Sequence, residues 1–283
     1  KVYFDGKGKG DVTFRTNGFS RRISIGGGYN GTINLNGYNL SIHQNINVGA
    51  GTTVEVPSGS RIMVTKFNST ISGTINAENG ELRFGKGLVI RASGTLNAPS
   101  GSLSIRGDFT NQGTFNHNNG LLVLNTSKNV KLNMGGTGSG KDLYNLTKSG
   151  KHTVTLNSNI SLNSFTMNTN GGVFRANGKT IYVSKNWTVN TNKYSGFVHQ
   201  NGTVTFNGTS AQSINTINGK SDFYNVTISN TSGNAVSLSK QIDVKNTLTI
   251  DNNATIDIDG KNIEISTLVN NGNFQLEGGE TVS

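Results

Sequence analysis

Residues 102–124 read SLSIRGDFTNQGTFNHNNGLLVL, and residues 180–206 read TIYVSKNWTVNTNKYSGFVHQNGTVTF. The two stretches match in order, with Phe109 of the first corresponding to Trp187 of the second. An internal repeat predicts an array of similar units that stack on their neighbours. This repeat therefore decides the fold class before any single motif is considered.

The repeat extends beyond the two quoted stretches. Gly120 matches Gly202, and Tyr144 matches Tyr224, at nearly the same offset in the sequence. A third copy begins at Asn262 and is incomplete. The period of the repeat is therefore about 80 residues, which is long enough to contain several coils of a solenoid.

Short runs of alternating apolar and polar residues recur throughout the chain. A period of two predicts strands with one buried face, and the Asn-Gly, Gly-Gly and Ser-Gly pairs between the runs predict tight turns. Val204, Val226 and Leu248 are equally spaced, and Ile265 and Val282 follow at a shorter spacing. This spacing predicts coils of about 20 residues, roughly four to each repeat and about 14 in all.

We therefore predict an all-β, single-domain parallel β-solenoid, or β-helix, with about 20 residues per coil and super-repeats of about 80 residues. One solenoid is expected over 1–283. Residues 1–84 form divergent N-terminal coils, and residues 85–283 form regular super-repeats, the last of them incomplete. Only 32% of the residues are apolar, with 38 Gly and 2 Pro, which suits a narrow core better than a globular one.

Aromatic residues at equivalent positions of the copies are candidates for the core. We expect each of them to point into the solenoid or lie at its corners, because stacked aromatics in a coil pack against one another. The set is Phe109, Phe115, Tyr144, Trp187, Phe197, Tyr224 and Phe274.

One segment nearly matches a phosphate-binding loop. Gly135–Lys141 reads GGTGSGK, but Asp142 stands where the motif needs Ser or Thr, and the strand-like LYNLT follows where a helix is required. We interpret the segment as a surface turn and expect neither a nucleotide nor any other cofactor.

Candidate catalytic and metal-binding residues are sparse. His117 and His199 occupy equivalent positions of separate copies, so they cannot share a metal, and we expect both at turns or on the surface. Asp257 and Asp259 lie on one face of one strand and are interpreted as part of an acidic stripe rather than a catalytic pair. We therefore predict no catalytic residue, no metal ligand and no enzymatic activity.

The net charge of +10 raises the question of a nucleic-acid partner. Lys and Arg are scattered along the chain, and Arg21-Arg22 is the only adjacent pair of arginines, so we expect no nucleic-acid binding. No run of eighteen apolar residues is present, which gives no membrane span. Cysteine is absent, which excludes disulfides and a thiol nucleophile.

The segment GTVTFNGTSAQSI, followed by FYNVTIS and then VSLSKQIDVKNTLTI, resembles the repeats of bacterial surface β-solenoid proteins of the adhesin-like and autotransporter-like kinds. The resemblance covers roughly residues 85–283. It implies a parallel β-helix on an exported protein, at the cell surface or outside the cell.

The two ends of the chain differ in charge. Residues 1–30 carry six basic and two acidic side chains, and residues 241–283 carry two basic and seven acidic ones. With strand-like segments at both ends, this predicts a structural subunit of an extracellular filament that assembles head-to-tail by stacking of solenoid ends. The expected assembly interface consists of Lys1, Val2, Tyr3, Phe4, Phe14, Phe274, Glu280 and Val282.

Two other classes of function stay open. The first is a surface adhesin, which binds glycans or a host surface along an exposed strand face. The second is a solenoid polysaccharide lyase or hydrolase, or an ice-binding solenoid. The small number of carboxylates counts against the enzyme, and the irregular Thr-x-Thr spacing counts against ice binding. Polymerisation distinguishes the filament subunit from the adhesin.

Overall fold

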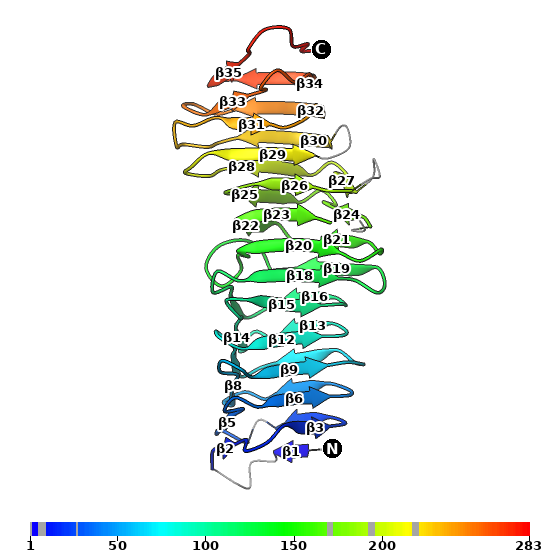
Figure 1. The fold of residues 1–283 in the computed structure, drawn as a ribbon, viewed down its shortest axis with the longest axis vertical. Coiled ribbons are helices and arrows are strands. Elements are labelled where there is room, and N and C mark those ends of the chain that lie inside the picture. Colours follow the sequence, from blue (N-terminus) through cyan, green and yellow to red (C-terminus); the bar gives the residue numbers. More distant parts are fainter. Residues whose placement is uncertain (1, 5–9, 27, 169–171, 192–195, 217–220) are drawn as a thin grey trace. The chain divides into compact units, whose positions relative to one another are not determined.

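The computed structural model describes residues 2–4, 10–26, 28–168, 172–191, 196–216 and 221–283. Every regular element in these residues is a β-strand, and none is a helix. The chain divides into two compact units, unit 1 over Lys1–Tyr144 and unit 2 over Asn145–Ser283. Within each unit parallel strands stack turn upon turn (Figure 1), which confirms the predicted all-β parallel β-solenoid.

Unit 1 has three strands in each turn, and each strand pairs in parallel with the strand three places later. The first column contains β1 (Val2–Phe4), β4 (Ile23–Ile25), β7 (Ile46–Val48), β10 (Ser69–Ile71), β13 (Leu88–Ile90), β16 (Phe109–Asn111) and β19 (Val130–Asn133). The second contains β2 (Val12–Thr13), β5 (Thr32–Asn34), β8 (Thr53–Glu55), β11 (Thr74–Asn76), β14 (Thr95–Asn97) and β17 (Thr114–Asn116). The third contains β3 (Gly18–Ser20), β6 (Asn39–Ile42), β9 (Arg61–Val64), β12 (Glu81–Phe84), β15 (Ser102–Ile105) and β18 (Leu121–Asn125).

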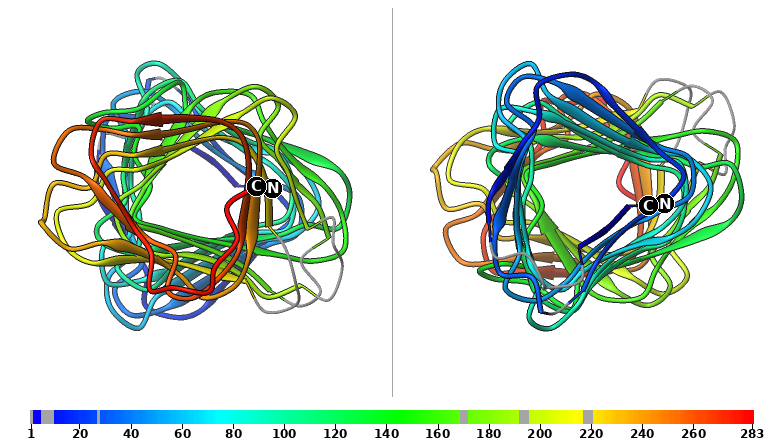
Figure 2. Two further views of the ribbon diagram at one scale, coloured as in Figure 1. Left: turned by 90° about the horizontal axis from the view of Figure 1, so that it is seen from above. Right: turned by 90° about the horizontal axis from the view of Figure 1, so that it is seen from below.

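Alternation along these strands builds the core of unit 1. Ile33, Val54, Ile75 and Leu96 are register partners in successive turns and are at most 3% exposed. The neighbours of these four residues along each strand face outward, as the period of two requires. Seen end-on in Figure 2, the first turns run along three sides around this core.

Unit 2 begins with three strands per turn and ends with two. One column contains β20 (Asn145–Ser149), β23 (Ser164–Met167), β26 (Trp187–Val189), β29 (Gln212–Thr216), β31 (Val236–Leu238), β33 (Thr255–Asp257) and β35 (Asn273–Gln275). Another contains β21 (Val154–Leu156), β24 (Phe174–Arg175) and β27 (Phe197–Val198). The third contains β22 (Ile160–Leu162), β25 (Thr180–Val183), β28 (Thr203–Phe206), and the longer β30 (Ser221–Ile228), β32 (Ile242–Ile250) and β34 (Ile263–Asn270).

The predicted strand spacing is confirmed in one part of unit 2 and wrong in the next. Val204 pairs with Val226, and Val226 pairs with Leu248, as their equal spacing predicted. The next partner in this column is Leu268 rather than Ile265. Ile265 pairs instead with Val244, and the register shortens by one residue between Val244 and Thr247.

The predicted place of the C-terminal segment is also wrong. Residues 280–283 were expected to continue the column of Val204. Instead Val282 bridges Ile263, which lies at the opposite end of β34 from Leu268. The cause is the length of β34, which spans positions that earlier turns divide between two strands.

The structure also corrects the number and grouping of the turns. There are about 12 turns of roughly 21 residues, so the turns are fewer and slightly longer than predicted. Residues 134–144 contribute no strand, and such loops account for part of the difference. β15 and its equivalent β25 lie in different sheets, so the super-repeat is not a whole number of turns.

One tight turn recurs in both units and explains part of the Asn and Gly content. The amide of its fourth residue donates to the carbonyl of its first over 2.8–3.0 Å, and its two central residues have φ between 42° and 86°. Positive φ at both positions is the type I′ geometry, which favours Asn, Asp and Gly. The turn occurs at Leu35–Tyr38, His117–Gly120, Ala176–Lys179, His199–Gly202 and Ile258–Lys261.

Most of the predicted aromatic core is confirmed. Four of the seven residues are at most 8% exposed, namely Phe109, Phe115, Trp187 and Phe197. Tyr144 and Tyr224 are instead half-buried at the surface, and Phe274 is half-buried in the last turn.

Candidate functional site

The last turn of unit 2 exposes apolar side chains at positions that earlier turns bury. Leu268 is 43% exposed, whereas its register partner Leu248 is fully buried. Leu276 and Val282 are also exposed. Because β35 has β33 as its single neighbour among the described strands, its other edge presents unpaired backbone groups.

The first turn of unit 1 also exposes an apolar side chain at a position that the next turn buries. Val2 is 41% exposed, whereas its register partner Ile23 is 5% exposed. An apolar cavity of about 190 Å³ opens beside Val2. Its lining consists of Val2, Phe14, Gly18, Phe19, Ser20, Ile23, Ile25, Ile33, Leu40, Ile46 and Val54.

The residues predicted for an assembly interface lie in these two end turns as far as the structure describes them. Lys1 lies outside the described residues, and the backbones of Tyr3 and Phe4 pair with β4. Phe14 and Phe274 are half-buried.

Glu280 makes contacts within its own turn. Its carboxylate accepts hydrogen bonds from the amides of Glu277 and Gly278 at 2.5 and 2.6 Å. These backbone amides, that of Glu277 first, lower the pKa of Glu280. The negative charge at this end is therefore held close to the backbone of residues 277–280.

Both units carry a stacked histidine–tyrosine pair at the equivalent position of the repeat. The ring centroids of His117 and Tyr144 are 5.4 Å apart, and those of His199 and Tyr224 are 5.5 Å apart. Each histidine accepts a hydrogen bond at Nδ1 from the amide two positions later in the chain. Both histidines thus lie at turns, as predicted.

A column of carboxylates lies next to His199 in unit 2. Asp222, Asp243 and Glu264 are register partners on β30, β32 and β34. Lys245 forms an ion pair with Asp243 at 3.0 Å. This column was not predicted from the sequence, although the three acids are equally spaced along the chain.

Three groups at this column have shifted pKa values, namely Asp222, Lys245 and His199. Desolvation raises the pKa of Asp222; Lys245 opposes this rise, and Asp243 adds to it. The hydrogen bond to Asp243 raises the pKa of Lys245. Desolvation lowers the pKa of His199, and Asp222 opposes that change. The lysine therefore stabilises the acidic column.

Two shallow hollows follow one another along a corner of unit 1, at the ends of the strands in its third column. Their volumes are about 470 and 280 Å³, and both are lined by Thr65. Five outward-facing residues line them, in register from turn to turn: Phe19, Ser41, Met63, Arg83 and Ser104. Five corner residues follow two positions later in each turn: Arg21, His43, Thr65, Gly85 and Arg106. We call these ten residues the corner groove.

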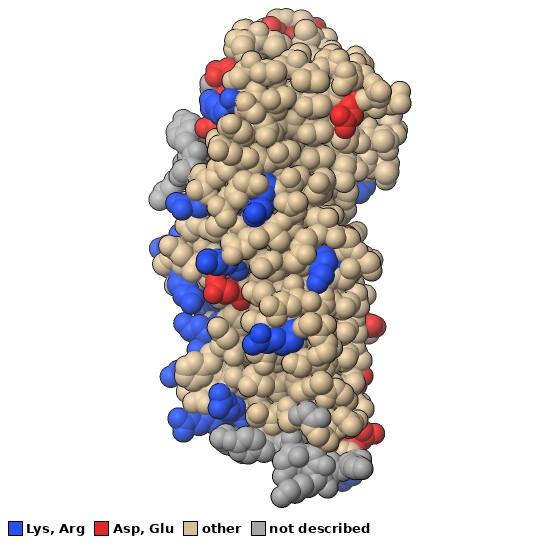
Figure 3. Space-filling view, turned by 180° about the vertical axis from the view of Figure 1, so that it is seen from behind, with Lys and Arg blue, Asp and Glu red and all other residues tan. Residues whose placement is uncertain are grey.

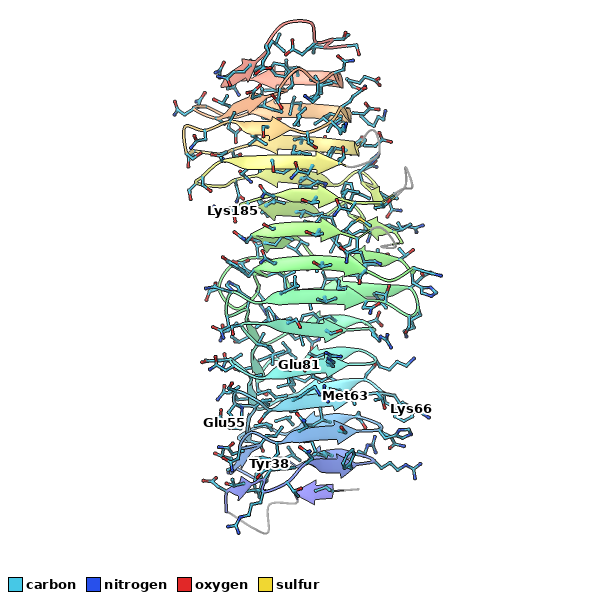
Figure 4. The ribbon with its side chains drawn as sticks, viewed as in Figure 1. Tyr38, Glu55, Met63, Lys66, Glu81 and Lys185 are labelled. Atoms are coloured by element: carbon cyan, nitrogen blue, oxygen red, sulfur yellow. The ribbon has the colours of Figure 1, made fainter. Side chains whose placement is uncertain are left out.

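The surroundings of the corner groove are basic. Lys66 follows the groove residue Thr65, is exposed, and extends outward beyond β9 (Figure 4). Lys and Arg gather along one edge of the N-terminal part of the chain (Figure 3). The sequence appeared to scatter these charges, because residues one turn apart become neighbours only when the turns stack.

The segment that resembles a phosphate-binding loop uses its polar groups within the chain. The amide of Gly138 donates to the Asp142 carboxylate at 2.7 Å, and Lys141 Nζ donates to the carbonyl of Gly113 at 2.6 Å. No helix follows it among the described residues. These contacts agree with a turn.

Asp257 and Asp259 do not form the expected acidic stripe. Asp257 accepts a hydrogen bond from the amide of Asp259, and its register partners are Ser237 and Gln275. Asp257 therefore stabilises the turn. Among the described residues, no three His, Asp or Glu side chains are placed to hold a metal ion.

The described part of the chain contains no helix long and apolar enough to cross a membrane. Comparisons with protein-family models, with curated proteins and with solved structures found no match.

Proposed function

We propose that this chain is a structural subunit of an extracellular filament, in which solenoid ends stack head-to-tail by β-strand pairing. The observation that carries the proposal is the exposure of Leu268 in the last turn, at a position where Val226 and Leu248 are fully buried. A further turn placed on this edge would bury Leu268 in the same way.

The first turn of unit 1 supplies the complementary surface in this proposal. Val2 and the apolar cavity beside it offer the same kind of partly covered core. Each backbone hydrogen bond formed at the junction contributes about 0.5–1.5 kcal/mol net. Burial of the exposed apolar side chains adds to this.

Charge orients the contact rather than driving it. The basic residues of segment 1–30 would meet the acidic residues of segment 241–283. Such complementarity raises the association rate and selects the orientation more than it tightens the contact. Added salt should therefore slow assembly without dissolving formed filaments.

The resemblance to bacterial surface solenoids supports an exported location for this function. Light scattering after size exclusion and negative-stain microscopy should show linear polymers whose length grows with protein concentration.

A charged substitution at the end turn should stop this growth. Leu268→Lys should leave a folded monomer, because a charge at the end of the core opposes the stacking of a further turn. Phe67→Lys is the matched control, since Phe67 is exposed to a similar extent but lies between β9 and β10, at the side of unit 1. A wild-type protein that stays monomeric at every concentration would overturn the proposal.

A further inference from the structure

The corner groove of unit 1 is elongated and could accommodate a linear polymer. Its residues come from five successive turns, each displaced from the last by the strand spacing of ~4.8 Å, so the four steps between them cover roughly 19 Å. The two hollows meet at Thr65. A ligand that fills both must therefore extend along the direction in which the turns stack.

The charges of the groove favour an anion. Arg21 and Arg106 are exposed, and neither forms an ion pair with another described residue. Arg83, in contrast, is paired with Glu81. Among the described residues, no Asp or Glu lines either hollow. Guanidinium groups of this kind bind carboxylate and sulfate groups through two parallel hydrogen bonds.

The remaining lining favours a sugar polymer. Hydroxyl side chains recur along the groove, at Ser41, Thr65 and Ser104, and the amide of Asn125 extends the lining one turn beyond Arg106. Groups that both donate and accept hydrogen bonds suit the hydroxyls of a polysaccharide. Phe19, which is 84% exposed, adds a flat apolar face at one end of the groove.

We propose that the corner groove binds a linear acidic polysaccharide, with Arg21 and Arg106 engaging its carboxylate or sulfate groups. The groove shares Phe19 with the cavity of the first turn, and its other nine residues lie along the side of unit 1, so this inference does not rest on end-to-end stacking. Single-stranded nucleic acid is the less favoured polyanion. Its binding relies on aromatic platforms that recur along the strand, and Phe19 is the one exposed Phe, Tyr or Trp in the described lining.

Binding is tested by calorimetric titration of the full chain with two polyanions, polygalacturonate for carboxylates and heparin for sulfates. Dextran serves as the neutral sugar, and an oligothymidylate serves as the nucleic acid. Titrations are repeated in the Leu268→Lys background, so that polymerisation and side binding are measured separately. We expect an acidic polysaccharide to bind, dextran to be silent, and the oligothymidylate to bind more weakly.

The groove is then tested by paired substitutions. Arg21→Gln with Arg106→Gln should weaken binding about fivefold per arginine, which corresponds to ~1 kcal/mol per basic side chain at an anionic surface. The dependence of affinity on salt should also become shallower. Arg91→Gln is the matched control, because Arg91 is an exposed arginine of unit 1 that lies outside the groove.

Four results would overturn the proposal: no polyanion binds, dextran binds equally well, the oligothymidylate binds more tightly, or Arg91→Gln weakens binding as much as the groove variant does. All three arginines are exposed, so the variants should keep the melting temperature of the wild type. Their binding data then report contacts with the polymer rather than loss of the fold.

Discussion

The equivalent positions Phe109 and Trp187 occupy different cores in the two units. In unit 1, Phe109 stacks in register between Leu88 and Leu132, and among the described residues it contacts one other ring, that of Phe115, at 5.6 Å. Unit 2 instead gathers rings around Trp187, whose partners are Phe165, Phe197 and Phe223 at 4.3, 4.8 and 5.8 Å.

This difference shows what the repeat conserves. Both positions are fully buried, so the copies share the requirement for a large apolar side chain. The neighbours are free to change as long as the volume is filled, because cores tolerate exchanges that keep volume and pattern. Unit 1 fills the volume mainly with aliphatic columns, and unit 2 does so with an aromatic cluster.

The largest effect is expected where the two cores differ most. Trp187→Ala should cost about 3–5 kcal/mol in the free energy of unfolding, toward the upper end, because the cavity is large. Phe109→Ala should cost about 1–3 kcal/mol less, since each aromatic pair adds ~0.5–1.5 kcal/mol and Trp187 has two more partners. Denaturant titration of both variants measures the difference, and equal costs would contradict the importance of the cluster.

Trp187→Phe sharpens this comparison. The indole N–H of Trp187 is buried and has no hydrogen-bond partner among the described residues. Exchange for phenylalanine therefore removes volume without breaking a hydrogen bond, and most of the stability should remain. A loss as large as that of Trp187→Ala would show that the indole makes a polar contact essential to the cluster.

The second largest effect concerns a buried lysine of unit 2. Lys148 is fully buried, pairs in register with Met167, and donates from Nζ to the carbonyls of Ser149 and Gly150 at 3.0 and 2.9 Å. Burial lowers the pKa of Lys148 to about 8. The unfolded chain therefore takes up a proton near pH 10.5, whereas the folded chain does so only near pH 8.

Stability should follow from this difference in proton uptake. Relative to Lys148→Met, the wild type should lose up to about 3 kcal/mol as the pH falls from about 10.5 to about 8, with no further loss below pH ~8. Denaturant titrations of both proteins across this range measure the difference between them. A difference that does not change with pH would show that the lysine is protonated in both states.

The fold follows from the sequence to a large extent, because the period of two and the Asn-Gly pairs specify strands and turns locally. The pairing of Val204, Val226 and Leu248 was predictable for this reason. The register of Leu268 was not, since it depends on a shift inside the pairing of β32 with β34. The local pattern of apolar and polar residues does not show where the register between two long strands shifts by a residue.

The candidate sites were harder to predict. Arg21 and Arg106 are far apart in the sequence, and they share a groove only because the turns stack in register. The column of Asp222, Asp243 and Glu264 was hidden for the same reason. Once the length of a turn is known, both sets become visible as residues of like charge separated by whole turns.

A smaller effect should be equal in the two units, because it depends on a turn that they share. Asn119 and Asn201 are third in their turns, with φ of 55° and 60°. Replacement of either by Ala should cost about 1–2 kcal/mol, since a Cβ without a compensating polar group is disfavoured at positive φ. Melting curves for both alanine variants and for the matching glycine variants measure this. Unequal costs, or a loss with Gly as large as with Ala, would contradict the shared turn.

The smallest effect concerns a ladder of hydrogen bonds between asparagine side chains of unit 1. Asn97 donates to Asn76 and accepts from Asn116 at 2.6 Å, in a ladder that ends on Glu55. Asn97→Ala breaks two of these bonds and should cost about 0.5–1.5 kcal/mol, because the ladder lies at the partly solvated surface. Asn116→Ala, at the end of the ladder, breaks one bond and should cost about half as much. If the two variants unfold at the same denaturant concentration, the number of side-chain bonds broken does not matter, and the side-chain ladder does not stabilise the fold.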